Sequence, residues 1–156
     1  MDAPDRPSAV ADVRFVRVVR ADARAVAGVR NEFCRWIRTH LALDDERVSD
    51  MVLAVNEALA NAAEFAYVTM PEPGAVSIEA VHNAATASLA VTVSDSGVWY
   101  DADRTVRSRH RGRGISLMEA LSDDATIERL PDGTRVRLLF ADCAAVPDRP
   151  GAMSEA

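Results

Sequence analysis

Apolar residues recur along this 156-residue chain with two different periods, and the order of these periods is what most constrains its fold. Alternation at every second residue is typical of a strand, and recurrence at every third or fourth residue is typical of an amphipathic helix. The predicted strands are Val13–Val19, Ala75–Val81, Ser88–Ser94, Ala125–Leu130 and Thr134–Phe140, and the predicted helices are Asp22–Thr39, a second from Asp44 to a point before Pro71, and Ile115–Leu121. This order favours an α+β fold, a two-layer sandwich in which helices cover one face of a mixed sheet.

The length and the apolar content fit one domain. Hydrophobic residues make up 49% of the chain, which is enough for a single core. We expect this domain to span residues 13–140, between a disordered N-terminus at 1–12 and a disordered C-terminal tail at 141–156. The polar start lacks the pattern of a signal peptide, and no apolar run is long enough to cross a membrane. We therefore expect a cytoplasmic protein with no membrane partner.

The charge of the chain excludes several kinds of function. Its net charge is −6, whereas general nucleic-acid binding requires a surplus of cations, so no nucleic-acid partner is expected. All 18 basic residues are arginine, which excludes a P-loop lysine and a Schiff-base lysine. Cys34 and Cys143 show no repeated spacing, so we expect two reduced thiols and neither a zinc site nor a disulfide framework.

Glu57 and Asn61 stand four residues apart on the second predicted helix and therefore share one face. This face points away from the apolar stripe that contains Val52, Val55 and Leu59. Asparagine is unfavourable in the middle of a helix because its side chain competes for backbone hydrogen bonds. A carboxylate at this position could orient a nucleophile, and an amide oxygen could ligate Mg²⁺. A solvated helix face is the alternative interpretation.

Three further short patterns lie in the second half of the chain, and each is weak by itself. Asp95 and Gly97 follow a buried strand, which suits either a ligand-binding carboxylate or a plain turn. The stretch between Gly97 and Gly114 is dense in charge and without periodicity, so we expect a functional loop there. The glycines at its end could bring backbone N–H groups and a helix N-terminus to phosphates, or could serve as a hinge. Thr134 starts the last strand, beside a hairpin turn.

In their order along the chain, Glu-x-x-x-Asn, Asp-x-Gly, Gly-x-Gly and Gly-Thr resemble the four ATP-binding boxes of the GHKL superfamily, which has the Bergerat fold. The resemblance spans about Val13 to Phe140. Within that superfamily, the segments 56–62 (NEALANA) and 112–118 (GRGISLM) look most like those of bacterial anti-sigma-factor serine kinases. The resemblance implies an ATP-dependent kinase that phosphorylates a serine of a STAS-domain anti-anti-sigma protein and that sequesters a sigma factor.

The resemblance also implies a role for each matching residue. Asn61 would hold Mg²⁺ between the phosphates of ATP, and Glu57 would be the general base acting on the serine hydroxyl. Asp95 would bind the adenine amino group, supported by Gly97 and, through a water molecule, by Thr134. Phosphoryl transfer depends chiefly on positioning and on charge compensation, which these residue types can supply.

The glycine-rich segment would close over the phosphates through the backbone of Gly112, Arg113, Gly114 and Ile115, and the Arg113 side chain would contribute positive charge. The resemblance further implies a homodimer, although periodicity does not show which apolar face the two copies share. Two positions depart from the family pattern. Phe65 stands where many such kinases carry histidine, and Trp99 stands near a position where other members have a second glycine. These departures favour an alternative, namely a catalytically weak or inactive ATP-binding module that regulates a protein partner.

Overall fold

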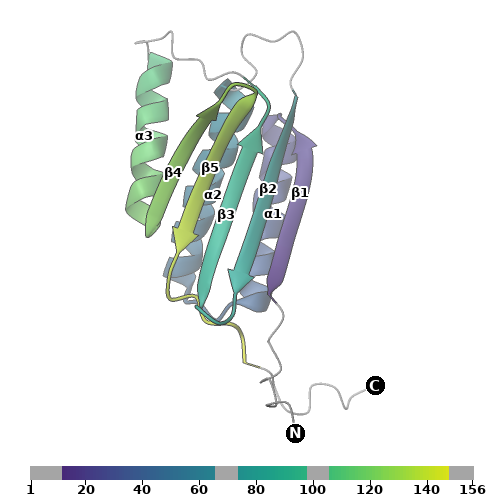
Figure 1. Ribbon diagram of the computed structural model, residues 1–156, viewed down its shortest axis with the longest axis vertical. Helices are drawn as coiled ribbons and strands as arrows, with labels where there is room; N and C mark the ends of the chain where they lie inside the picture. The colour runs from purple at the N-terminus through teal and green to yellow at the C-terminus, as the bar shows by residue number, and fades with distance from the viewer. Residues whose placement is uncertain (1–11, 66–73, 98–105, 148–156) are drawn as a thin grey trace, which may run out of the picture.

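The structure, a computed structural model, describes residues 12–65, 74–97 and 106–147, with the side chains of 65 and of 106–113 left out. The described strands are β1 (Val13–Arg20), β2 (Ala75–Asn83), β3 (Ser88–Asp95), β4 (Asp124–Leu130) and β5 (Gly133–Phe140). The described helices are α1 (Ala23–His40), α2 (Asp45–Phe65) and α3 (Val106–Leu121). Figure 1 shows the strands forming one sheet with α1 and α2 behind it and α3 beside β4, which confirms the predicted α+β sandwich.

The sheet has the strand order β1-β2-β3-β5-β4, and every neighbouring pair is antiparallel. The prediction of a mixed sheet was therefore wrong, because the described sheet contains no parallel pair of neighbouring strands. Two helices connect β1 to β2 and return the chain in the opposite direction, so these neighbours are antiparallel. The strands β3 and β4, which precede and follow α3 along the chain, run in the same direction. They do not pair with each other, because β5 lies between them and pairs with both.

One layer of apolar side chains joins the sheet to the helices. In α1, Asp22 caps the N-terminus by accepting a hydrogen bond from the Ala25 N–H at 2.8 Å. The helix then buries a stripe at helical spacing: Val26, Val29, Phe33 and Ile37. In the sheet, alternate residues of β3 point to this core, so Leu89, Val91 and Val93 are buried. The opposite face of β3 carries the small residues of the strand.

Helix α3 differs from its prediction. It begins at Val106 and not at Ile115, so the two glycines of the Gly-x-Gly pattern lie inside the helix and not before it. Glycine costs about 1 kcal/mol relative to alanine in a helix interior, but the arginines of this segment are good helix formers. At Gly114 the absence of a side chain also permits a close approach to α2, as described below.

The chain beyond β5 packs onto the domain as far as Val146, although the sequence led us to expect a disordered tail from residue 141. Cys143 is fully buried, and its carbonyl oxygen lies 2.6 Å from Nε2 of His82, which is also buried. His82 lies one residue beyond the predicted end of the strand at Val81, and it occupies an inward position of β2. Ala145 forms a β-bridge with Leu41 at the end of α1. Residues 141–146 (ADCAAV) are mostly small and show no periodic pattern, which is why the sequence did not predict this anchor.

An ion pair at the start of β4 ties the same segment to α2. Asp123 Oδ2 accepts hydrogen bonds from the Ala141 N–H at 2.7 Å and from Arg47 Nη2 at 3.0 Å. The backbone hydrogen bond, and to a lesser extent Arg47, lowers the pKa of Asp123 below its ordinary value of 3.8. A carboxyl whose pKa falls on folding stabilises the fold at pH values above the unfolded pKa, and this contribution disappears as the pH falls through the folded pKa.

We therefore expect Asp123→Asn to unfold more easily than the wild type at neutral pH. The difference in free energy of unfolding should begin to shrink as the pH falls below about 3.8, where the carboxyl of the unfolded wild type takes up a proton. It should disappear once the pH has passed the lower pKa of the folded carboxyl. Urea titrations at a series of pH values measure this difference. A gap between the two proteins that stays constant from pH 7 to the lowest pH at which both fold would contradict the assignment.

Candidate functional site

Glu57 and Asn61 lie on the side of α2 that meets α3, where both side chains are half-buried. The contact is close at Gly114. A Cβ atom built on Gly114 would lie 3.0 Å from Oε2 of Glu57, 3.3 Å from Nδ2 of Asn61 and 3.5 Å from its Oδ1. The two side chains predicted to carry the chemistry therefore converge on one point of the glycine-rich segment. A fully solvated helix face, the alternative considered from the sequence, does not describe this arrangement.

Asp95 and Thr134 face the helix layer at the end of the sheet. They are partners in the register of β3 and β5, and each continues the inward alternation of its strand, after Val93 and before Val136. Thr134 is only 5% exposed. Oδ1 of Asp95 accepts a hydrogen bond from the Gly97 N–H at 3.0 Å, which holds the carboxylate at the strand end.

Gly133 fixes the relative position of these two strands. A Cβ atom at this residue would lie 1.9 Å from the backbone oxygen of Asp95, a distance that no side chain could accommodate without a backbone shift. Glycine at 133 thus allows the β4–β5 turn to pass directly against the end of β3. A cavity of about 180 Å³ opens there, and its lining residues are Ser94, Asp95, Ser96, Leu130, Asp132, Gly133, Thr134 and Arg135.

The helix pair and the strand pair lie toward one end of the molecule. Figure 1 shows the C-terminal end of α2, the end of β3, the turn between β4 and β5 and the N-terminal end of α3 at the upper end of the view. Asn61 is one turn from the end of α2, so it lies nearer than Glu57 to this end. The cavity is smaller than the roughly 300 Å³ at which pockets for whole ligands begin, so it suits one part of a nucleotide.

The structure gives less information on the remaining predicted residues. Ile115 is half-buried against the apolar core, so its side chain packs internally. Gly112 and Arg113 belong to α3, but the Arg113 side chain is outside the described part of the chain. The same holds for the side chain of Phe65 and for the whole of Trp99.

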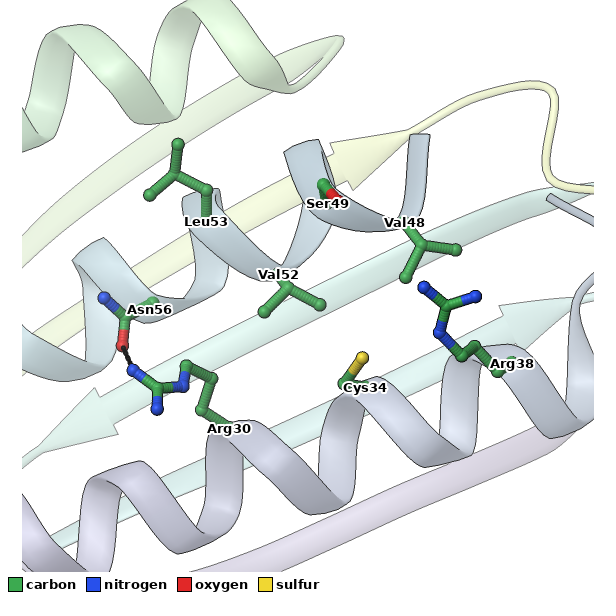
Figure 2. Close-up of a pocket in the computed structure, with 8 residues that line it drawn as sticks. All are labelled: Arg30, Cys34, Arg38, Val48, Ser49, Val52, Leu53 and Asn56. Atoms are coloured by element: carbon green, nitrogen blue, oxygen red, sulfur yellow. Dashed lines mark hydrogen bonds between the residues drawn. The ribbon is translucent and has the colours of Figure 1, made fainter. Parts of the chain in front are cut away.

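A second cavity, which the sequence analysis did not predict, lies between α1 and α2. Figure 2 shows side chains from both helices around it, and its volume is about 280 Å³. Nη1 of Arg30 donates a hydrogen bond of 3.4 Å to Oδ1 of Asn56 across the cavity. Asn56 therefore faces α1, whereas its neighbour Glu57 faces α3. The spacing of Arg30, Cys34 and Arg38 in the sequence places these residues on one face of α1, and it is the feature from which this cavity could have been predicted.

Glu57 and Asn61 thus meet a glycine-bearing second helix, toward the end of the sheet at which β3 ends in Asp95. A model of the histidine kinase-like ATPase domain matches residues 19–140. The chain belongs to this family.

A solved structure supports the same fold. The chain is similar to the crystal structure of the RsbU and RsbW domains of Rv1364c from Mycobacterium tuberculosis, with 23% sequence identity and a TM-score of 0.65. The match covers 88% of this chain and 34% of that chain. This domain therefore spans about a third of the length of that structure.

The described residues fit the ligand that the family binds. The Asp95 carboxylate can accept a hydrogen bond from an amino group, and Thr134 next to it is a buried polar side chain. Asn61 offers an amide oxygen, which is the kind of ligand that Mg²⁺ accepts together with phosphate oxygens and water. At Gly114, the backbone approaches Glu57 and Asn61 without an intervening side chain.

We expect Gly114→Ala to weaken binding of Mg-ATP by roughly tenfold while the protein stays folded, because the added methyl group must shift the ends of the Glu57 and Asn61 side chains by a few tenths of an ångström. Calorimetric titration measures the affinity. The matched control is Gly28→Ala, where a Cβ atom would meet nothing within 4 Å. This control should keep the wild-type affinity and raise the free energy of unfolding by about 0.5–1 kcal/mol. Equal affinities for the two variants would contradict the proposed contact.

Proposed function

We propose that this protein is an ATP-dependent serine protein kinase and anti-sigma factor, which phosphorylates a STAS-domain anti-anti-sigma protein and sequesters a sigma factor. The observation that carries the proposal is the convergence of Glu57 and Asn61 on Gly114, toward the end of the domain that holds Asp95 and Thr134. The motif segments 56–62 and 112–118, which resemble those of anti-sigma-factor serine kinases, meet in this contact. Membership in the ATPase family supports the use of ATP.

In this proposal Asn61 holds Mg²⁺ through its amide oxygen, and the ion would neutralise charge on the phosphates of the bound ATP. Asp95 holds the adenine amino group, with Gly97 fixing the carboxylate by the 3.0 Å hydrogen bond and Thr134 supporting it from β5. The segment Gly112 to Ile115, which lies within α3, would face the phosphates with the side that Gly114 leaves open toward Asn61. Positioning of the nucleotide is thus divided between the sheet end, which binds the base, and the two helices, which bind the phosphates.

Glu57 is the proposed general base. Its carboxylate lies on the α3 side of α2, one helical turn before Asn61, so a serine hydroxyl that approaches the bound phosphates from that side comes within its reach. The carboxylate would take the hydroxyl proton as the oxygen attacks the terminal phosphorus of ATP, and ADP would be the leaving group. The proposal includes a cytoplasmic location, in keeping with the proposed partners, and a homodimer, which the resemblance implies.

A second candidate function is a non-catalytic module in which nucleotide binding controls a protein surface. Phe65 and Trp99 favour it, because these residues depart from the family pattern. The two candidates share the nucleotide site and differ in phosphate transfer, so separate measurements of binding and of transfer distinguish them.

The nucleotide site is tested first by calorimetric titration of ATP and ADP, with and without Mg²⁺. We expect Asp95→Ala to lower the affinity by about ten- to a hundredfold, because it removes a hydrogen bond to a charged group that contributes about 1.5–3 kcal/mol. In Asn61→Ala the dependence on Mg²⁺ should disappear. Absence of binding to the wild type at millimolar nucleotide would overturn the site and both candidate functions.

The kinase is tested by incubation with a STAS-domain protein and labelled ATP. We expect Glu57→Ala to lower the rate of phosphate transfer by about two to four orders of magnitude, the usual contribution of a positioned base, with little change in ATP affinity. The control is Glu64→Ala, an exposed carboxylate of the same helix, which should transfer phosphate at the wild-type rate. Unchanged transfer in Glu57→Ala would refute the base, and tight nucleotide-dependent partner binding without any transfer would select the second candidate.

A further inference from the structure

The cavity between α1 and α2 takes no part in the proposed nucleotide site. Asn56 lines this cavity, whereas the next residue, Glu57, lies against Gly114 on the α3 side of α2. Leu53, another lining residue, is 41% exposed, so the cavity is open to solvent and a small molecule can enter it. Its volume of about 280 Å³ is close to the roughly 300 Å³ at which ligand pockets begin. The cavity can therefore hold a small ligand but not a nucleotide or a folded peptide segment.

The two ends of this cavity differ in chemistry from its middle. Figure 2 shows Arg30 and Arg38 at opposite ends of the α1 wall, with Cys34 between them. The two arginines are eight residues apart, which corresponds to about 12 Å along the helix axis. On the α2 wall, Val52 and Leu53 lie between the same two ends. The cavity thus has a largely apolar middle and a guanidinium group at each end.

The charge of Arg38 is balanced within the chain. Its Nη1 atom lies 2.8 Å from Oδ1 of Asp45. The hydrogen bond to Asp45, followed by an interaction with the Cys34 side chain, raises the pKa of Arg38 above its ordinary value. A ligand anion at this end would have to compete with the Asp45 carboxylate, so this end is the less favourable one for a negative group.

The charge of Arg30 is not balanced in this way. Arg30 forms no ion pair with another residue of the described part of the chain. Its hydrogen bond to Oδ1 of Asn56 is 3.4 Å long, beyond the usual range of about 2.7–3.2 Å, and it uses one of five guanidinium N–H donors. None of the described residues that line the cavity is acidic. A half-buried cation therefore faces the cavity without a counter-ion from these residues.

We propose that this cavity binds a small monocarboxylate that carries an apolar chain. The carboxylate pairs with Arg30 at the Asn56 end, where a planar guanidinium can donate two parallel hydrogen bonds to it. The chain lies along Cys34, Val52 and Leu53 toward Arg38. The volume equals that of about nine water molecules in the liquid, so a ligand of about eight non-hydrogen atoms, such as hexanoate, fits it.

Other anions suit the cavity less well. An inorganic anion such as phosphate could pair with Arg30, but it would leave the apolar middle of the cavity in contact with water. A dicarboxylate long enough to reach both arginines would meet the existing pair of Arg38 and Asp45 at the far end. One unpaired guanidinium at one end of an apolar groove is complementary to one carboxylate at one end of an apolar chain.

Calorimetric titration of the full chain with hexanoate tests the proposal. We expect a dissociation constant on the order of 1 mM or below for a ligand of this size. Each buried CH₂ group raises the affinity about fourfold, so butanoate should bind about tenfold more weakly or worse. The neutral analogue 1-hexanol should also bind about tenfold more weakly, because it lacks the charged partner for Arg30.

Matched variants show which arginine holds the carboxylate. We expect Arg30→Gln to weaken hexanoate binding by about tenfold or more, and to reduce the preference for hexanoate over 1-hexanol. Arg38→Gln, at the other end of the same cavity, should keep the affinity within about threefold, because the charge it removes is already paired and exposed. The control is Arg35→Gln, an exposed position of α1 that does not line the cavity, which should bind as the wild type does.

The Cys34 thiol gives an independent readout of where the ligand binds. Cys34 is half-buried in the cavity wall, whereas Cys143 is fully buried elsewhere. At about ten times its dissociation constant, hexanoate should slow the alkylation of Cys34 by iodoacetamide about tenfold. Mass spectrometry of the peptides locates the label. Phosphate at the same concentration should give no protection, and hexanoate should give little in Arg30→Gln.

Several outcomes would overturn the proposal. Absence of saturable binding and of Cys34 protection at about 10 mM hexanoate would show that the cavity does not bind this class of ligand. Equal affinities for hexanoate and 1-hexanol, or a loss in Arg38→Gln as large as that in Arg30→Gln, would refute the pairing with Arg30. Because Asp95→Ala should bind hexanoate as the wild type does, failure of this cavity and failure of the nucleotide site are separable.

Discussion

The alternation of side chains along β3 is the constraint on which the rest of the structure depends. This strand is central in the sheet, and its inward residues Leu89, Val91 and Val93 are all at most 2% exposed. The next inward position is Asp95, so the same alternation that builds the core delivers a carboxylate to the end of the helix layer. The outward residues are small, and they leave the other face flat. A shift of one residue in the register would exchange these two surfaces.

The second requirement is a close contact between two helices. Gly114 lets α3 approach α2 where Glu57 and Asn61 stand, and a methyl group there would already crowd both side chains. The helix loses propensity at each glycine but gains a short distance between the backbone and two polar groups. Gly133 acts in a similar way at the sheet end, where the backbone of the β4–β5 turn passes against Asp95. Two residues without side chains thus set the spacing on both sides of the candidate site.

Most of the fold could be predicted from the sequence, because the periodic segments are long and their caps are clear. Asp22, the first residue of the predicted helix, caps α1, and the Pro-Asp-Gly turn joins β4 and β5. The beginning of α3 could not be predicted, since arginines and glycines between 106 and 114 show no apolar period. The antiparallel arrangement of all the strands depends on the insertion of β5 between β3 and β4, which is a tertiary event. The anchor at residues 141–146 depends on His82, which is buried in the core and contacts the Cys143 carbonyl oxygen.

The candidate site was predictable as a set of residues and only partly as an arrangement. Helical spacing placed Glu57 and Asn61 on one face, but which neighbour that face would meet could not be inferred from one helix alone. The pairing of Asp95 with Thr134 follows from strand register, which a single sequence does not specify. The cavity between α1 and α2 was missed because its charged and apolar members read as an ordinary amphipathic surface.

The anchor between residues 141–146 and the end of α1 has a consequence for how this domain can be joined to others. The Val146 N–H donates to the His40 carbonyl oxygen at 2.9 Å, so the described chain finishes beside the same end of the molecule at which β1 begins. The candidate site lies at the opposite end. Polypeptide attached before β1 or after the anchor would leave from the far side of the domain, and both attachments would leave the candidate site accessible. The architecture is therefore suited to use as a module that can be tethered at either terminus without obstruction of the candidate site.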